Sequence, residues 1–555
     1  MCKRSLLLIW VLMAFITGMA QSSYIQPGVK DEYLLQQMEI KTRSSKLRLS
    51  QIRPMLIRDA VHDIEQLDSL IRTNDSVGNK FSKVDRYNIQ SLLMHYPEWS
   101  KYRESYASKK RLFNTFYHNK SIAVEINKPD FYLAFNPILQ LQYQKEQGNN
   151  EKLLLNTRGT YVRGIIGKKL GFQFYFTENQ ERLPGYANQY INTFKAVPGV
   201  GYYKRQQGYD YFDTRASLTW KVSRYVDMQL GHDKHFIGNG HRSLLLSDFG
   251  TTYNFLKVQT RYKKLFYQNI FAEFTAYNPS LGAGDKLYTR KYFRASYLNI
   301  GLSNWLDVGV FEGLMLGKTD QLSLKLFNPV IFTNVRRSKR YSIQDRSYAG
   351  IDMKANLPYR MQFYGQAMID NISLRENRQW WGNRFGYQLG VKAVDVFNLR
   401  NVDVQAETNV VRPFTYAAND SIANYTHFNL PLAHPLGGNF KEYIFIVRAQ
   451  PFPKLYVQAK LVHYKQGLDS AGLNYGSNPF VNTGIRVKDE IAIAAGNTAT
   501  VSYGSFVISY EWKENLFFDA ALIRRTSSTE IDDKTTTNIF SVGIRLNMGR
   551  REFDY

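Results

Sequence analysis

Cysteine is almost absent from this 555-residue chain, in which the only one is Cys2. A single cysteine allows no internal disulfide and no site built from several thiolates. Proline is also scarce, with 16 residues, and beyond the first twenty residues no apolar run reaches the roughly 18 residues that a membrane-spanning helix needs. Tyrosine (39) and phenylalanine (35) are abundant instead, which favours β-strands.

The amino terminus predicts export. Lys3 and Arg4 precede an apolar run, and Gly18-Met19-Ala20 has the small residues of a cleavage site. Residues 1–20 are therefore predicted to be a secretory signal peptide cut after Ala20. The alternative is an uncleaved anchor, which the short length of the run disfavours. Cys2 precedes the cleavage site, so no lipoprotein anchor is expected.

Residues 21–115 are expected to form a small N-terminal α-helical bundle in the periplasm. Apolar residues recur at helical spacing from Ile57 to Ile71, and Ser82 with Asp85 resembles a helix-capping pair. Residues 26–40 predict a further short helix, and Pro54 a helix start. A membrane-lying helix is the alternative, although the polar faces lack the lysines expected there.

From residue 116 onward the predicted structure is an outer-membrane β-barrel. Val402, Val404 and Ala406 alternate with Asp403 and Gln405, and Asn538–Met548 shows the same pattern. Alternation of this kind puts one face toward lipid and the other toward a polar lumen. A β-sandwich strand shows the same alternation. About 18 segments of roughly 9–12 residues, joined alternately by short turns and long loops, favour an all-β transmembrane barrel of about 18 antiparallel strands.

The most concentrated polar segment is Gly231–Asp248, which contains His232, His235 and His241. No carboxylate cluster completes a metal site, and Gly238-Asn239-Gly240 lacks the Lys-Ser/Thr pair of a phosphate loop. Two interpretations remain, a glycine-rich turn with its charges in the lumen and a lumen segment that contacts a ligand. No nucleophile motif or cofactor site is predicted, although paired carboxylates for sugar hydrolysis stay open.

The charge of the chain is strongly basic, at +25, and removing residues 1–20 takes away only Lys3 and Arg4 and leaves +23. The densest basic run is Arg336–Arg340. A nucleic-acid partner is not expected in an exported chain without a binding motif. Cations beside tyrosines suit an acidic polysaccharide or lipopolysaccharide phosphates, and the alternative is a charge that only sets solubility.

Two segments resemble a known family. GHDKHFIGNGHRSLLLSDFG (231–250) and HFNLPLAHPLGGNFKE (427–442) are similar to the Wzi-type capsule-assembly barrels, most of all to the gliding-motility RemB-like group of Bacteroidetes. The resemblance implies an 18-stranded barrel, a helical bundle at its periplasmic mouth and a role in holding surface polysaccharide. The long loop around His434 and the histidine-rich turn depart from the enteric capsule barrels.

The predicted function is an outer-membrane barrel that binds or organises surface capsular or exopolysaccharide, with gliding motility as a role implied by the resemblance. The alternatives are a transport or secretion pore and a secreted all-β carbohydrate-active enzyme. The expected partners are surface polysaccharide or lipopolysaccharide, and outer-membrane lipid. The candidate ligand-binding residues, of which all but His235 and Arg336 are implied by the resemblance, are His232, Lys234, His235, Gly238, Gly240, Arg242, Arg336 and His434.

Overall fold

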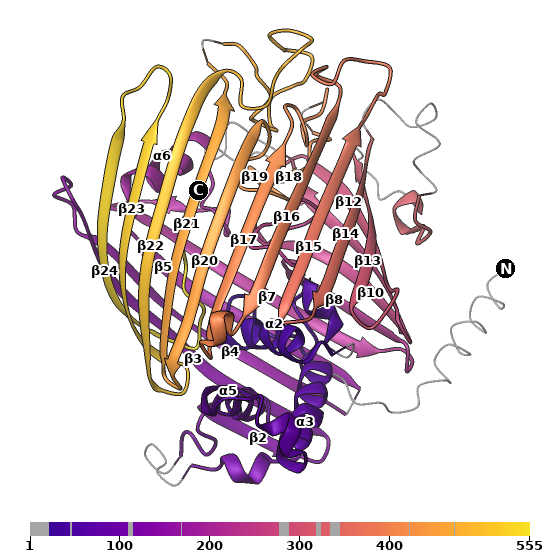
Figure 1. Cartoon of the computed structure of the whole chain (residues 1–555), viewed down its shortest axis with the longest axis vertical. Coiled ribbons are helices and arrows are strands. Elements are labelled where there is room, and N and C mark those ends of the chain that lie inside the picture. The colour runs from indigo at the N-terminus through magenta and orange to yellow at the C-terminus, as the bar shows by residue number, and fades with distance from the viewer. Residues whose placement is uncertain are drawn as a thin grey trace.

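A computed structural model describes residues 22–44, 47–108, 115–167, 169–276, 288–317, 324–332, 345–420, 422–470 and 472–555. In these residues eighteen antiparallel strands form a closed barrel, because the last strand pairs with the first wall strand (Figure 1). The predicted fold class is thereby confirmed. The signal peptide predicted for residues 1–20 lies outside the described residues.

The wall strands are long and follow one another in chain order around the barrel. They are β3 (Phe131–Glu146), β4 (Leu153–Ile166), β5 (Leu170–Glu181), β7 (Tyr209–Lys221), β8 (Val226–Asp233), β10 (Tyr253–Tyr262), β11 (Leu265–Thr275), β12 (Arg290–Gly301), β13 (Leu306–Leu316), β14 (Arg346–Leu357), β15 (Met361–Asn371), β16 (Arg384–Val394), β17 (Val402–Val411), β20 (Phe440–Phe452), β21 (Leu455–Leu468), β22 (Asn497–Lys513), β23 (Leu516–Ser528) and β24 (Thr535–Leu546). Two short strands, β2 (Val124–Lys128) and β6 (Lys204–Arg205), pair with β3 and β7.

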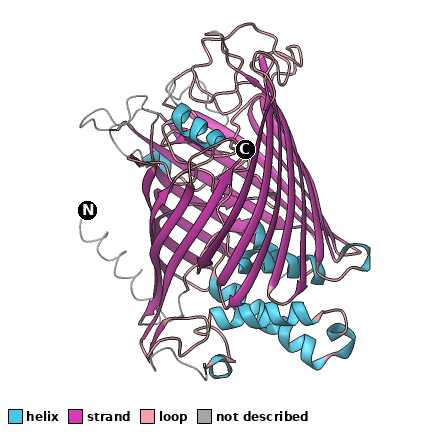
Figure 2. Ribbon diagram, turned by 90° about the vertical axis from the view of Figure 1, so that its left-hand side faces the viewer, coloured by secondary structure: helices cyan, strands magenta, loops and turns pink. Residues whose placement is uncertain are grey.

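Connections between wall strands alternate between the two ends of the barrel. At one end they are short turns, such as residues 263–264 after β10 and 514–515 after β22. At the other end they include the long segments 182–208, 412–439 and 469–496 (Figure 2). Short turns are periplasmic and long loops extracellular in bacterial outer-membrane barrels. The molecule has the construction of an outer-membrane protein.

The two faces of each wall strand differ as the sequence predicts. On β17, Gln405 and Glu407 are only 3% and 4% exposed, whereas Val404 and Ala406 are half-buried on the outer face. On β24, Phe540 is 49% exposed and its neighbour Ser541 is 5% exposed. Apolar side chains therefore face lipid and polar side chains face a filled lumen.

The described helices of the N-terminal region lie at the turn end of the barrel (Figures 1 and 2). They are α2 (Lys30–Thr42), η1 (Arg48–Gln51), α3 (Ile57–Thr73), α4 (Asp75–Gly78), α5 (Lys83–His95) and η2 (Arg103–Tyr106). The predicted capping pair is confirmed, since the Ser82 hydroxyl accepts from Asp85 N–H and the Asp85 carboxylate accepts from Ser82 N–H. The predicted helix start at Pro54 is wrong by three residues, because α3 begins at Ile57.

Helix α2 contacts the lumen side of the wall rather than forming a separate cap. Glu39 on α2 pairs with Lys354 on β14 at 2.6 Å, and both side chains are fully buried. Gln37 donates to Asp403 on β17. Among the described residues, no helix is both long and apolar enough to cross a membrane.

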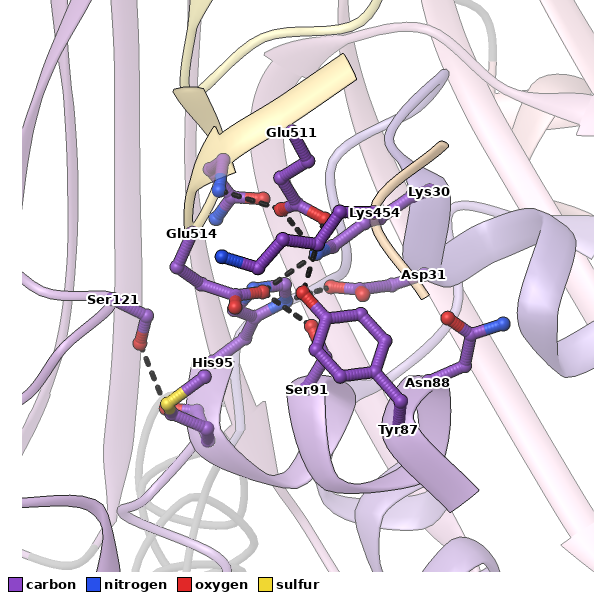
Figure 3. Close-up of polar contacts among 12 residues, drawn as sticks. Lys30, Asp31, Tyr87, Asn88, Ser91, His95, Ser121, Lys454, Glu511 and Glu514 are labelled. Atoms are coloured by element: carbon purple, nitrogen blue, oxygen red, sulfur yellow. Dashed lines mark hydrogen bonds and ion pairs between the residues drawn. The ribbon is translucent and has the colours of Figure 1, made fainter. Parts of the chain in front are cut away.

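A second attachment joins α2 and α5 to the end of β22 and to the turn that follows it (Figure 3). The Lys30 ammonium lies 2.6 Å from Glu511 and 2.5 Å from Glu514. The His95 ring lies 2.7 Å from Asp31 and 2.8 Å from Glu514. Burial alone would lower the pKa of His95, but the two carboxylates outweigh it and raise this pKa to about 9.

One part of the outer wall departs from the apolar pattern. Arg294 on β12 and Glu312 on β13 occupy outward positions, pair at 2.8 Å and are fully buried. Loop residues cover them, since Arg294 donates to the Asn328 carbonyl and Phe332 N–H donates to Glu312. A charged pair facing lipid would be costly, and the loop removes that contact.

Leu522, on the outer face of β23 between Phe506 and Phe540, tests the facing of the wall. It is 57% exposed, so Leu522→Arg would place a charge in lipid and should lower the free energy of unfolding by roughly 2–4 kcal/mol. Urea unfolding in lipid vesicles measures this, with Leu522→Met as the matched control. Equal stability of the two variants would contradict the assignment of β23 to the lipid face.

The His95 cluster should make stability depend on pH. Because the pKa of His95 is raised, its contribution is complete below about pH 6.5 and is lost as pH rises through about 9. The pKa of Glu514 is lowered, since Lys30 and His95 outweigh burial, so its contribution is lost only in acid. Thermal unfolding of the whole chain should therefore begin at a lower temperature at pH 9.5 than at pH 6.

The matched control uses two histidines. His95→Gln should remove most of this alkaline loss, whereas His62→Gln, whose side chain is 67% exposed, should keep it. An alkaline loss of the same size in His95→Gln would show that other groups cause it.

Candidate functional site

The segment 234–252, between β8 and β10, folds into the lumen. Its strand β9 (Phe236–Ile237) pairs with β1 (Ile52–Arg53) of the N-terminal region. Leu244, Leu245 and Leu246 are fully buried in an apolar cluster with inward residues of the wall. The apolar triplet therefore fixes the polar residues that precede it against the inside of the barrel.

Two glycines allow this segment to lie close to the wall. Gly238 has φ +142°, and a Cβ there would lie 2.4 Å from Nε2 of Gln366. A Cβ on Gly240 would lie 2.7 Å from Oε2 of Glu407. The Glu407 carboxylate accepts from the N–H groups of His241 and Arg242, so larger residues at the glycines would disturb these contacts.

The two segments that carried the family resemblance meet in the lumen at Glu442. Nε2 of His434 lies 2.7 Å from Oε2 of Glu442, and Nη2 of Arg242 lies 3.5 Å from Oε1 of the same carboxylate. His434 also stacks on Phe440 at 4.3 Å. His434 and Glu442 are completely buried, so this contact joins loop 412–439 to the histidine-rich segment.

The carboxyl-terminal tail, residues 548–555, also enters the lumen, and the C-terminus lies inside the barrel outline in Figure 1. The Asp554 carboxylate lies 2.8 Å from His241, 3.0 Å from Arg242 and 2.6 Å from Lys460. Burial would raise the pKa of Asp554, but Arg242, Lys460 and a hydrogen bond with His241 hold it well below its usual range. The prediction missed Asp554, although the charged residues after the last alternating strand were a signal that the tail leaves the wall.

The structure brings six of the eight predicted site residues together and places His232 apart from them. Lys234, His235, Gly238, Gly240, Arg242 and His434 lie in or beside the lumen. His232 shares the outward face of β8 with the exposed Leu230, and its ring contacts Asn254 and Thr252. Arg336 lies outside the described residues.

His235 contacts a side chain, whereas Lys234 contacts backbone carbonyl groups. His235 contacts the Tyr253 hydroxyl at 3.0 Å, and burial lowers its pKa well below the usual range, so its ring is neutral. The Lys234 ammonium donates to the backbone carbonyls of Gly199 and Asp248.

Within the part of the chain that the structure describes, no group of three or more His, Cys, Asp or Glu side chains could hold a metal ion.

Two adjoining cavities remain in the lumen, with volumes of about 370 Å³ and 540 Å³. They share Arg53, His241, Arg448 and Glu552 in their linings. Cations outnumber carboxylates in both, and tyrosines line both. Cavities of about 300–1,000 Å³ with a few polar groups are typical of small-ligand sites.

Asp554 tests whether charge holds the tail in the lumen. Asp554→Asn removes one charged partner from Arg242 and from Lys460, which keep Glu442 and Glu552. The variant should lose about 1–3 kcal/mol of unfolding free energy and expose the tail to carboxypeptidase. Asp533→Asn, on an exposed loop, is the control. If carboxypeptidase digests the tail equally slowly in the unchanged protein and in both variants, Asp554 does not hold the tail in the lumen.

Comparison with known proteins identifies the fold. No protein-family description matches the sequence, and a search of curated proteins finds no match. Among solved structures, Wzi of Escherichia coli, described as a carbohydrate-binding β-barrel involved in group 1 capsule assembly, is similar with a TM-score of 0.56 and 11% identity, over 95% of this chain and 100% of that one. OprD of Pseudomonas aeruginosa gives a TM-score of 0.42 and 10% identity over 74% and 94%. The chain therefore shares the fold of the Wzi barrel.

Proposed function

We propose that this protein binds an acidic surface polysaccharide, whose carboxylate or phosphate groups pair with cations of the lumen. The observation that carries the proposal is a set of cations that line the cavities without a carboxylate partner. We also propose that the chain consists of a signal peptide (1–20), a helical region (21–115) and a barrel (116–555).

Arg448 and Lys392 support the proposal most directly, since both line the 370 Å³ cavity. Arg448 donates to Gln405 and lies over the Tyr33 ring at 4.8 Å, and Lys392 donates to Gln36. Among the described residues, neither has a carboxylate within 4.0 Å. A desolvated cation gains most from an anionic partner, and an acidic sugar would supply one through charge-assisted hydrogen bonds.

The 540 Å³ cavity adds tyrosines to the cations. Arg551 lies over the Tyr211 ring at 4.9 Å, and Arg215 lies over Tyr175 at 5.1 Å. Tyrosine combines an apolar ring with a hydroxyl, which suits the mixed surface of a sugar. Both arginines also pair with a carboxylate, Arg551 with Glu181 at 3.6 Å and Arg215 with Asp213 at 2.7 Å, so this cavity suits a sugar unit without adding an unpaired cation.

The Wzi barrel, which shares the fold, is described as carbohydrate-binding, and that agrees with the proposal. The resemblance to the RemB-like group extends the proposed function to gliding motility, in which the bound glycan would act at the cell surface. Segment 234–252, the tail and α2 occupy the lumen, which favours binding over an open pore.

Replacing the two unpaired cations tests the function. Arg448→Ala with Lys392→Gln should weaken binding of polygalacturonate, a carboxylated polysaccharide, by about 10–100-fold, the equivalent of about one charged hydrogen bond. Binding of the unchanged protein should weaken with salt, and neutral dextran should not bind. Arg242 is unsuitable for this test because it holds the tail.

Arg375→Gln, which removes a cation from an exposed loop, is the matched control and should bind as the unchanged protein does. Heat-dependent gel mobility checks that each barrel is folded. Unchanged polygalacturonate binding by the folded double variant would refute the lumen site.

A further inference from the structure

Basic side chains border the apolar band of the outer wall at its loop end. On β22 the outward residues Tyr510, Ile508 and Phe506 are followed toward the loops by Gly504 and Ser502. On β21 the outward Leu461 is followed by His463 and Lys465, and on β23 Leu522 is followed by Arg524. Each of these strands therefore changes from apolar to polar or basic at a corresponding position.

Two of the cations lie side by side on neighbouring strands. Lys441 on β20 lies directly opposite Lys465 on β21. Like charges placed opposite each other repel, which destabilises the pair unless an anion lies between them. Among the described residues, none of the cations Lys441, Lys465 and Arg524 has a carboxylate within 4.0 Å, and His463 forms a hydrogen bond with Ser502 at 2.8 Å.

A groove in the outer wall begins beneath these cations. It has a volume of about 460 Å³, and its lining includes Tyr443, Phe445, Leu461, Gly504 and Arg524. Gly504 has no side chain on the outer face, so it leaves a gap between its partners Leu461 on β21 and Arg524 on β23. The groove thus offers an apolar floor and a cationic upper border.

We propose that this groove binds lipid A, the phosphorylated anchor of lipopolysaccharide, with an acyl chain in the groove and a phosphate at Lys441, Lys465 and Arg524. Long loops mark the extracellular side, so the groove faces the outer leaflet, where this lipid resides. Basic clusters at a membrane border bind anionic headgroups, and Arg and Lys bind phosphate. The site lies on the outer wall and does not depend on the proposed lumen function.

Titration of the whole protein in detergent with fluorescent lipid A tests the proposal. Lys441→Gln with Lys465→Gln and Arg524→Gln should weaken binding at least tenfold, and Gly504→Phe should do so by filling the groove. The control Lys128→Gln with Lys263→Gln and Lys513→Gln removes three exposed cations from the turn end and should bind as the unchanged protein does. Dephosphorylated lipid A and phosphatidylglycerol should each bind at least tenfold more weakly than lipid A.

Lipid A carries no surface polysaccharide, so this result is independent of the lumen site. The Arg448→Ala, Lys392→Gln protein should bind lipid A normally whether or not it binds polygalacturonate. Equal lipid A binding by the loop-end triple variant and its control would overturn the proposal. So would equal binding of phosphorylated and dephosphorylated lipid A.

Discussion

Closure of the β-sheet is the constraint on which the rest of the structure depends. A strand in a bilayer finds no water for its N–H and C=O groups, so every strand needs a neighbour on both sides. Pairing of β24 with β3 meets this need and leaves the described strands of the wall without an exposed edge. Closure also separates two environments, and the alternation of side chains then decides which residues meet lipid and which meet the lumen.

Segments from distant parts of the chain occupy the lumen and supply partners for many of its charges. Lys354 meets Glu39 of α2, Glu407 accepts from the backbone of segment 234–252, and Lys460 meets Asp554 of the tail. Burial makes each of these charges costly without its partner. By the same argument, Arg448 and Lys392 of the lumen should gain from an anionic ligand, because the described chain provides no carboxylate for them.

The alternation of polar and apolar residues was sufficient to predict the barrel, its strand number and the two faces of β17, because lipid imposes a strict period of two. Local hydrogen bonding was sufficient to predict the Ser82–Asp85 cap. The convergence of Arg242, His434 and Asp554 was not predictable, since ion pairs between residues hundreds of positions apart leave no periodic trace. The outward direction of His232 was predictable from the apolar Met228 and Leu230, which precede it at two-residue spacing on β8.

Single-cysteine labelling in a Cys2→Ser background tests the separation of lipid, lumen and water most directly. Asp533→Cys, on an extracellular loop, should react in intact cells with a membrane-impermeant maleimide. Leu522→Cys should react only with a lipid-soluble maleimide, and Leu245→Cys, which is packed in the lumen and lines neither cavity, should react with neither until the barrel is unfolded. Rapid labelling of Leu245→Cys in the folded protein would contradict a lumen packed by segment 234–252, and reaction of Leu522→Cys with the impermeant reagent would contradict the lipid-facing wall.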